Sequence, residues 1–359
     1  MLIYLLVFIL SIFFINLADK SSNTLFRYFF CFLAIFLPAI LAGLRSHSIG
    51  TDTENYLLIF ESSKSYNNIG AFIKDLDNIE DGYLALNYFL QKIGATETQF
   101  LFIVHTIIHT CIVIAIFRLR KYINVGWALF IYLFMMYNES LNITRQYIAI
   151  AISLLAVSYY LTKDYKKAML AICVAIATHT SAYVCLIFPI LHIITKRYSF
   201  KRNAILLSII ILFVISICVI IAFTILPSIS DASVLEKVDN YLDAKGARAS
   251  YSLLFTYLFL SFILILKECR FGNRIIDTFI IISLIAVGMC CLAYISQYLY
   301  RFCLYPAIVF TISIAHMLKQ MSDNGILTKF SIISIVSFYW FYSYVYQGSH
   351  ETVPYISSL

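Results

Sequence analysis

The chain has 359 residues, of which 62% are hydrophobic and only 13% are charged. Soluble domains carry about 25% charged residues, so this composition excludes an ordinary soluble protein and indicates one embedded in lipid. The net charge of +7 does not indicate nucleic-acid binding, because the basic excess lies in short loops between apolar runs, where it orients membrane helices.

Apolar runs of about 17 to 25 residues recur along the whole chain, which is typical of a polytopic α-helical membrane protein. The runs do not alternate between polar and apolar residues, which excludes a membrane β-barrel. We expect an all-α fold with about 12 transmembrane helices (11 to 13), in a single integral membrane domain over 1–359. The expected spans are 1–17, 25–44, 99–117, 124–138, 145–162, 168–179, 181–195, 203–226, 250–266, 275–296, 302–318 and 328–346.

The first run, 1–17, has no basic segment before it and no small-residue cleavage site after it. We therefore expect a retained first helix rather than a removed signal peptide. The nine cysteines lie almost all inside apolar runs and form no CxxC pair. They are interpreted as small packing residues without disulfides or metal.

A large outer loop, 45–98, follows the second span and separates it from the third. It opens with Arg45-Ser-His-Ser-Ile-Gly-Thr-Asp-Thr-Glu-Asn-Tyr56, a cluster of charge, glycine and small polar residues at the mouth of a membrane helix. This cluster predicts a surface site for a charged, hydroxyl-rich ligand. Asp52 is either a base or the cap of a turn after Gly50-Thr51. The later charged residues of the loop, Glu80 among them, are interpreted as a solvated cover over the site.

His105 and His109 stand four residues apart in the third span, a spacing that a metal ion accepts. No carboxylate or third ligand accompanies them, so we predict no metal site.

Two arginines open later spans: Arg145 the fifth and Arg301 the eleventh. A helix N-terminus presents unpaired N–H groups and a positive dipole end, and guanidinium binds phosphate through two parallel hydrogen bonds. The two arginines therefore resemble two halves of a phosphate or diphosphate clamp. The alternative is that each pairs with a nearby acid such as Glu139, or extends toward lipid headgroups.

The run 168–195 has basic pairs at both ends, Lys166-Lys167 and Lys196-Arg197. Two short helices meeting at 179–181 return both pairs to one side of the membrane, as the positive-inside rule favours. His179 then lies at the apex of a hairpin. Its ordinary pKa near 6.5 suits proton transfer, while the alternative is a histidine within a helix cap. Placing the basic loops in the cytoplasm puts both termini and the 45–98 loop outside.

Three segments follow one another along the chain. The first combines Arg45 with Gly50-Thr-Asp and Asn55-Tyr56, the second is Asn142-Ile-Thr-Arg-Gln146, and the third is Ala177-Thr-His-Thr-Ser-Ala182. In this order they resemble the EpsG family of bacterial polysaccharide polymerases, which are of the Wzy type and include O-antigen polymerases. The resemblance extends from about residue 40 to 305.

The resemblance implies an enzyme at the periplasmic face of the bacterial inner membrane. Such a polymerase transfers a growing chain from undecaprenyl diphosphate to a new lipid-linked oligosaccharide repeat, by inverting glycosyl transfer and without metal or nucleotide cofactor. Expected partners are the lipid-linked oligosaccharides, the bilayer, a chain-length regulator and other assembly proteins, and no nucleic acid.

Roles for the residues follow from that chemistry. Arg145 and Arg301 would hold the diphosphate, and His179 or Asp52 would accept the proton of the acceptor hydroxyl. The remaining substrate-binding residues are expected to be Arg45, Tyr56 and Gln146.

Two other functions stay open. A glycosyltransferase that uses a polyprenyl-monophosphate sugar would use an acidic pair in its first outer loop, such as Asp52 and Glu54. A transporter of lipid-linked sugars would place ionisable groups near the membrane midplane, whereas here they cluster at helix mouths. The absence of a G-x-x-x-x-G-K-[ST] phosphate loop argues against an ATP-driven role.

Overall fold

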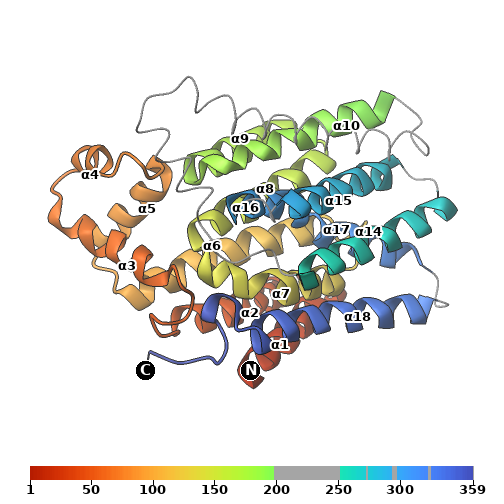
Figure 1. Ribbon diagram of the computed structural model, residues 1–359, viewed down its shortest axis with the longest axis horizontal. Coiled ribbons are helices and arrows are strands. Elements are labelled where there is room, and N and C mark those ends of the chain that lie inside the picture. Colours follow the sequence, from red (N-terminus) through yellow and green to blue (C-terminus); the bar gives the residue numbers. More distant parts are fainter. Residues whose placement is uncertain (198–250, 272–273, 293–296, 322–324, 359) are drawn as a thin grey trace. The chain divides into compact units, whose positions relative to one another are not determined.

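A computed structural model of the chain describes residues 1–197, 251–271, 274–292, 297–321 and 325–358. All regular elements in these ranges are helices (Figure 1), apart from one isolated bridge between Arg45 and Ser357. The all-α prediction is confirmed for this part of the chain. The predicted span 203–226 lies outside the described residues.

Five of the described helices are long and apolar enough to cross a membrane: Leu2–Lys20, Thr24–Gly43, Glu97–Arg118, Tyr300–Gln320 and Ile326–Tyr346. They support a multi-pass membrane protein. Shorter apolar helices lie at Thr180–Leu191, Tyr251–Leu266 and Thr278–Cys291. The expected total of about 12 spans stays a prediction.

The chain divides into two compact units, one of Met1–Cys185 with Ile314–Leu359 and one of Leu186–Ser313. The first unit contains every candidate site residue except Arg301, which belongs to the second. That the two units form a single integral domain stays a prediction.

The first unit is built on α1 (Leu2–Lys20), α2 (Thr24–Gly43), α6 (Glu97–Arg118), α7 (Val125–Asn142), α8 (Thr144–Leu161), α9 (Tyr165–Thr178) and α18 (Ile326–Trp340), which continues as a π-helix over Phe341–Tyr346. Helix α7 is central, because residues around its whole circumference are buried. It packs against α1, α6, α8 and α18, while α2 packs between α1 and α6, and α9 packs on α8. The C-terminal end of α7 and the N-terminal end of α8 meet at Ile143, next to the candidate site.

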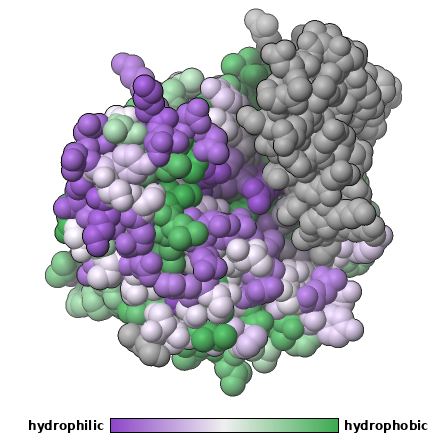
Figure 2. Space-filling view, turned by 60° about the vertical axis from the view of Figure 1, so that its left-hand side comes forward, coloured by the Kyte–Doolittle hydropathy of each residue, from purple (hydrophilic) through white to green (hydrophobic). Residues whose placement is uncertain are grey.

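The outer loop contains regular helices. It forms α3 (Thr53–Ser62), a 3₁₀ turn (Ser63–Ser65), α4 (Ile69–Asp75) and α5 (Asp81–Lys92). Phe72, Leu84 and Tyr88 give it a small apolar core of its own. Figure 2, turned toward this side of the molecule, shows hydrophilic residues gathered on the face with hydrophobic ones between them.

The second unit contains α10 (Ile187–Arg197), α14 (Tyr251–Phe271), α15 (Arg274–Leu292), α16 (Gln297–Ala307) and the first residues of α17 (Phe310–Gln320). Helix α15 packs against α10, α14 and α16. The expected span 302–318 lies within the apolar stretch Tyr300–Gln320 counted above. Inside this stretch a turn at 308–309 separates α16 from α17, close to Pro306, whose ring nitrogen cannot donate a backbone hydrogen bond.

The predicted break near His179 is confirmed. Helix α9 ends at Thr178, His179 is extended with φ −158° and ψ 120°, and a 3₁₀ helix covers Thr180–Leu186. The return of the chain as a hairpin through α10 stays a prediction, because α10 belongs to the second unit.

Candidate functional site

The site forms where α5 of the outer loop meets the end of α9. Gly82, in the first turn of α5, allows this approach: a Cβ there would lie 2.5 Å from the carbonyl oxygen of Ala177. Glu80 occupies the N-cap position of α5, yet its side chain does not cap its own helix. Its carboxylate extends instead to the turn that follows α9.

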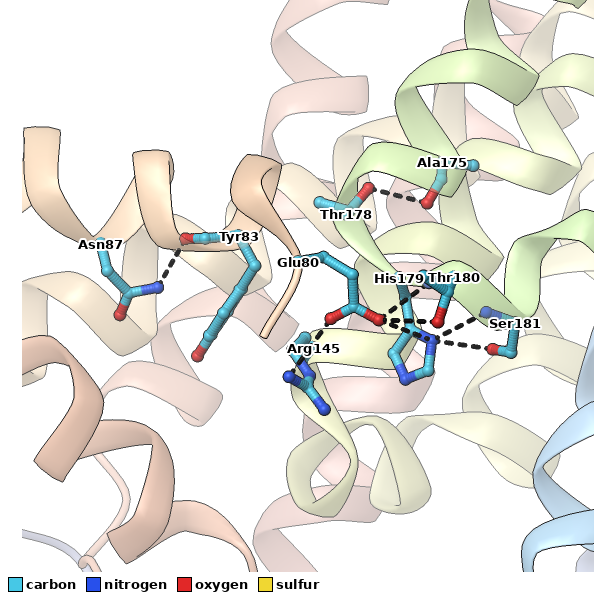
Figure 3. A network of polar contacts seen from close by, with 9 residues as sticks. All are labelled: Glu80, Tyr83, Asn87, Arg145, Ala175, Thr178, His179, Thr180 and Ser181. Atoms are coloured by element: carbon cyan, nitrogen blue, oxygen red, sulfur yellow. Dashed lines mark hydrogen bonds and ion pairs between the residues drawn. The ribbon is translucent and has the colours of Figure 1, made fainter. Parts of the chain in front are cut away.

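Four contacts converge on the Glu80 carboxylate, which lies between Arg145 and the turn at His179 (Figure 3). Its Oε2 lies 3.2 Å from Arg145 Nη1. Its Oε1 accepts hydrogen bonds from the backbone N–H of Thr180 at 2.8 Å and from the Thr180 hydroxyl at 3.1 Å. His179 Nδ1 lies 3.6 Å from the same oxygen. One carboxylate thus joins the outer loop to the mouths of α8 and α9.

The surroundings of Glu80 favour its ionised form. Its side chain is only 12% exposed, and this burial by itself would raise the pKa of the carboxyl. The backbone hydrogen bond from Thr180, the charge of Arg145 and the charge that His179 carries when it is protonated together outweigh burial and hold the pKa of Glu80 below its ordinary value. The carboxylate is therefore charged at neutral pH.

The ring of His179 is oriented by Ser181. The backbone N–H of Ser181 donates to His179 Nδ1 at 3.2 Å, and the Ser181 hydroxyl lies 2.8 Å from the same nitrogen. An accepting Nδ1 carries the lone pair, so the neutral ring holds its proton on Nε2. A proton arriving at Nδ1 would create a cation 3.6 Å from Glu80. This geometry allows His179 and Glu80 to form an ion pair whenever the ring is protonated, and the role of His179 as a base stays a prediction.

Arg145 lies in the first turn of α8, with its side chain 24% exposed. Its guanidinium lies 5.9 Å from the ring centre of Tyr83, which in turn contacts Tyr56 edge-on at 6.1 Å. Tyr56, predicted to bind substrate, is thereby linked to Arg145 through a buried aromatic ring. A guanidinium has five N–H donors, so a pair through Nη1 alone leaves it capable of binding an anion.

Arg45 is fully buried. Its Nη1 lies 2.9 Å from His105 Nε2, and its Nη2 donates to the carbonyl oxygen of Leu141 at 3.0 Å. Burial lowers the pKa of Arg45 to about 10, which still leaves it charged. This position favours a role in fixing the outer loop to the end of α7. Direct substrate binding by Arg45 stays a prediction, and its burial does not support it.

Asp52 lies at the N-cap of α3, but its side chain makes no capping hydrogen bond. Its backbone N–H donates to Asn142 Oδ1 at 2.9 Å, as does the Thr51 hydroxyl. Gly50 has φ +87°, and a Cβ there would lie 2.8 Å from the carbonyl oxygen of Leu141, so this turn requires glycine. The loop is thus fixed against α7, and the role of Asp52 as a base stays a prediction.

The remaining predicted residues lie in different places. Gln146 is 2% exposed, on α8 beside Arg145 in sequence. Arg301 lies in α16 of the second unit and is partly exposed, so its pairing with Arg145 stays a prediction. His105 and His109 are both buried, and His109 Nδ1 lies 2.9 Å from the Tyr132 hydroxyl.

Sequence reasoning missed Glu80, which it had assigned to a solvated cover. The alternative that Arg145 pairs with a nearby acid is confirmed, but the acid is Glu80. Glu139, the acid given as the example, is buried and lies 3.8 Å from His350 Nε2. The sequence did contain one signal for this contact: Glu80 lies two residues before Gly82. A glycine at the start of a helix lets another backbone approach closely, and the neighbouring acid can then bind that segment.

The C-terminal tail also reaches the site region. His350 Nδ1 lies 2.9 Å from Asn142 Nδ2, and the Thr352 hydroxyl accepts from Asn138 Nδ2 at 3.0 Å. The tail thus covers the end of α7, on which the 45–53 segment is also fixed.

The sequence as a whole matches a known protein family. The sequence model of the EpsG family matches residues 27–357, so the chain belongs to the EpsG family, and this confirms the resemblance seen in its three sequence segments. Membership indicates a multi-pass membrane protein of the polysaccharide-polymerase type. No curated protein and no solved structure matches the chain.

Proposed function

We propose that this EpsG-family protein polymerises undecaprenyl-diphosphate-linked oligosaccharide repeats at the outer face of the bacterial inner membrane. The observation that carries the proposal is the cluster of Glu80, Arg145 and His179 (Figure 3). It combines an anion-binding group with a base, which are the two functions that inverting glycosyl transfer to a hydroxyl requires.

In the proposed reaction, a hydroxyl oxygen of the new lipid-linked repeat attacks the anomeric carbon of the growing chain. The bond from that carbon to the diphosphate oxygen breaks, and its electron pair leaves with undecaprenyl diphosphate. The acceptor proton passes to His179 Nδ1, either directly or through the Ser181 hydroxyl 2.8 Å away. Glu80 stabilises the resulting imidazolium. Asp52 remains the alternative base.

Arg145 would bind the diphosphate and neutralise the charge that develops on the leaving oxygen. Its mobility is limited by the ion pair with Glu80 and by the Tyr83 ring, and a preorganised cation stabilises a transition state better than a freely moving one. Arg301 would supply the second half of the clamp, with Tyr56 and Gln146 beside the sugar.

Removing the gene tests the proposal at the level of product. We expect the surface-polysaccharide ladder of a deletion strain to collapse to a single repeat on its acceptor, and the intact gene to restore it. Loss of the repeat from the outer face altogether would favour a transporter instead. Unchanged chain length with one missing branch sugar would favour a transferase that uses a polyprenyl-monophosphate donor.

Purified protein separates these cases further. With lipid-linked repeats as the only added reactants, the wild-type chain should form oligomers and release undecaprenyl diphosphate, whereas Glu80→Gln should not at a comparable rate. Asp77→Asn is the matched control, because Asp77 is an exposed acid of the same loop.

A further inference from the structure

A second binding region lies on the first unit, between α2 and α6. A groove with a volume of about 930 Å³ opens there, and we refer to it as the α2–α6 groove. Phe32 and Phe36 of α2 and Phe102 and Val113 of α6 form apolar parts of its walls. Both helices are among those long and apolar enough to cross the membrane, so the groove faces a hydrocarbon environment.

The groove runs along the two helices and has two different ends. At one end the rings of Phe36 and Phe102 meet edge-on at 5.6 Å. At the other end lie Arg27 from the first turn of α2 and Arg118 and Arg120 at the end of α6. With a rise of 1.5 Å per residue, the part of α6 between Phe102 and Phe117 is about 22 Å long. One leaflet supplies half of the roughly 30 Å hydrocarbon core, so a single acyl chain fits along this length.

In the part of the chain that the structure describes, the arginines of the basic end form no close ion pairs, although Asp164 interacts with Arg118 at longer range. Within the described ranges, none of these three arginines forms an ion pair with a carboxylate. Arg27 Nη2 donates to the Ser21 carbonyl oxygen at 2.7 Å, and Arg118 Nη2 donates to the Thr162 hydroxyl at 2.7 Å. The Nε atoms of Arg27 and Arg118 are buried with no hydrogen-bond acceptor in the described structure.

We propose that the α2–α6 groove binds an anionic phospholipid of the bilayer, with its phosphate against Arg27 and Arg120 and one acyl chain between the helices. Guanidinium groups match phosphate oxygens in geometry and charge, and basic pockets between membrane helices recognise anionic headgroups. The arginines lie at the end of α6 that the charge distribution predicts to be cytoplasmic. The bound lipid would therefore belong to the leaflet opposite the proposed reaction.

This location separates the lipid from the substrate. Arg145, which we assign to the substrate diphosphate, lies at the mouth of α8, whereas Arg118 contacts Thr162 just beyond the other end of α8. The phospholipid would stabilise the packing of α2 on α6 without taking part in glycosyl transfer.

Native mass spectrometry of the full-length chain tests the proposal, with phosphatidylglycerol and phosphatidylcholine offered to delipidated protein. We expect phosphatidylglycerol to be retained preferentially. Arg27→Gln and Arg120→Gln should each weaken its retention about fivefold, as expected for one basic residue at a charged lipid surface. Lys121→Gln is the matched control, because Lys121 is exposed beside Arg120 but does not line the groove.

A second variant tests the apolar part. Thr110→Trp places a large ring in the middle of the groove and should reduce retention of phosphatidylglycerol while the variant still elutes as a single folded species. Equal retention of both lipids, or unchanged retention in the Arg27→Gln/Arg120→Gln double variant, would overturn the proposal. So would preferential displacement of phosphatidylglycerol by undecaprenyl phosphate, which would assign the groove to an isoprenoid lipid.

Discussion

Glu80 Oε2 lies 3.2 Å from Arg145 Nη1 and so joins the start of α5 in the outer loop to the first turn of α8 in the membrane bundle. Both side chains are mostly buried. A buried ion pair gains little net stability, but removing one partner leaves an uncompensated charge and costs about 3 to 5 kcal/mol. The pair therefore fixes where the loop docks, and it holds the guanidinium that we assign to the diphosphate.

Replacement of Glu80 by glutamine tests this role. Gln can still accept the hydrogen bonds of Thr180, but it lacks the charge that holds Arg145 and stabilises a protonated His179. Loss of one charge-assisted hydrogen bond costs about 1.5 to 3 kcal/mol, so turnover should fall roughly ten- to a hundredfold. A turnover assay with purified lipid-linked repeats measures this, and Asp77→Asn should stay close to wild type. Wild-type turnover in Glu80→Gln would show that the Glu80 charge is not needed for the reaction.

The same residue predicts a dependence of stability on pH. The pKa of Glu80 is lower in the folded chain than its ordinary value of about 4.3. The ionised group therefore contributes its full stabilisation above that value, and the contribution is lost as the pH falls through the folded pKa. Wild type should be more stable than Glu80→Gln at neutral pH, and the difference should shrink as the pH falls below the ordinary carboxyl pKa and then through the lower pKa of the folded chain. Thermal unfolding of both proteins across this range measures it; a constant difference would contradict the assignment.

Gly82 is predicted to control the docking of α5. A Cβ at this position would lie 2.5 Å from the Ala177 carbonyl oxygen. Because this oxygen belongs to the backbone of α9, it cannot move aside without distorting the helix. Gly82→Ala should shift α5 away from α9, separate Glu80 from Thr180, and reduce turnover while the protein still folds. Gly70→Ala is the control in the same loop, because its nearest neighbour would be Asn68 Oδ1 at 3.5 Å. Equal activity in the two variants would show that the close approach is not required.

Sequence alone predicted the long apolar helices well. The expected spans 25–44 and 99–117 differ by at most two residues at each end from α2, Thr24–Gly43, and α6, Glu97–Arg118, because a long apolar run has only one stable form in lipid. The break at His179 was also predicted from the sequence, because the positive-inside rule favours placing the basic pairs at both ends of the run on one side of the membrane.

The helices of the outer loop and the partner of Arg145 did not follow from sequence. Helix α5 is short and mixes apolar and polar residues, so its sequence is difficult to distinguish from that of a polar loop. The contact between Glu80 and Arg145 depends on how α5 docks, which is set by Gly82 against Ala177. Glu80 and Gly82 mark a point where α5 can dock closely, but a single sequence does not show which distant segment docks there.

Arg145 and Arg301 are predicted to need guanidinium rather than positive charge alone. Lysine has no planar pair of donors for a diphosphate, and at position 145 it would also pair less well with Glu80. Arg→Lys at either position should lower turnover about ten- to a hundredfold with normal expression. Full activity of the double Arg→Lys variant would overturn the clamp and favour anchors for lipid headgroups.

The identity of the base is settled by three variants compared in one turnover assay. If His179 accepts the proton, His179→Gln should lose about 10²- to 10⁴-fold in turnover while still binding the lipid-linked repeat. Asp52→Asn should be much milder, because the hydrogen bond that fixes this turn on Asn142 comes from the Asp52 backbone N–H, which the variant keeps. Ser181→Ala separates the two proton paths: it should cause a comparable loss if the hydroxyl relays the proton, and a small one if its backbone N–H alone orients the ring.

A severe loss in Asp52→Asn with an active His179→Gln would reverse the assignment and favour the monophosphate-sugar transferase. Near-wild-type turnover in both would mean that substrate alignment and leaving-group stabilisation carry the reaction, with water removing the proton.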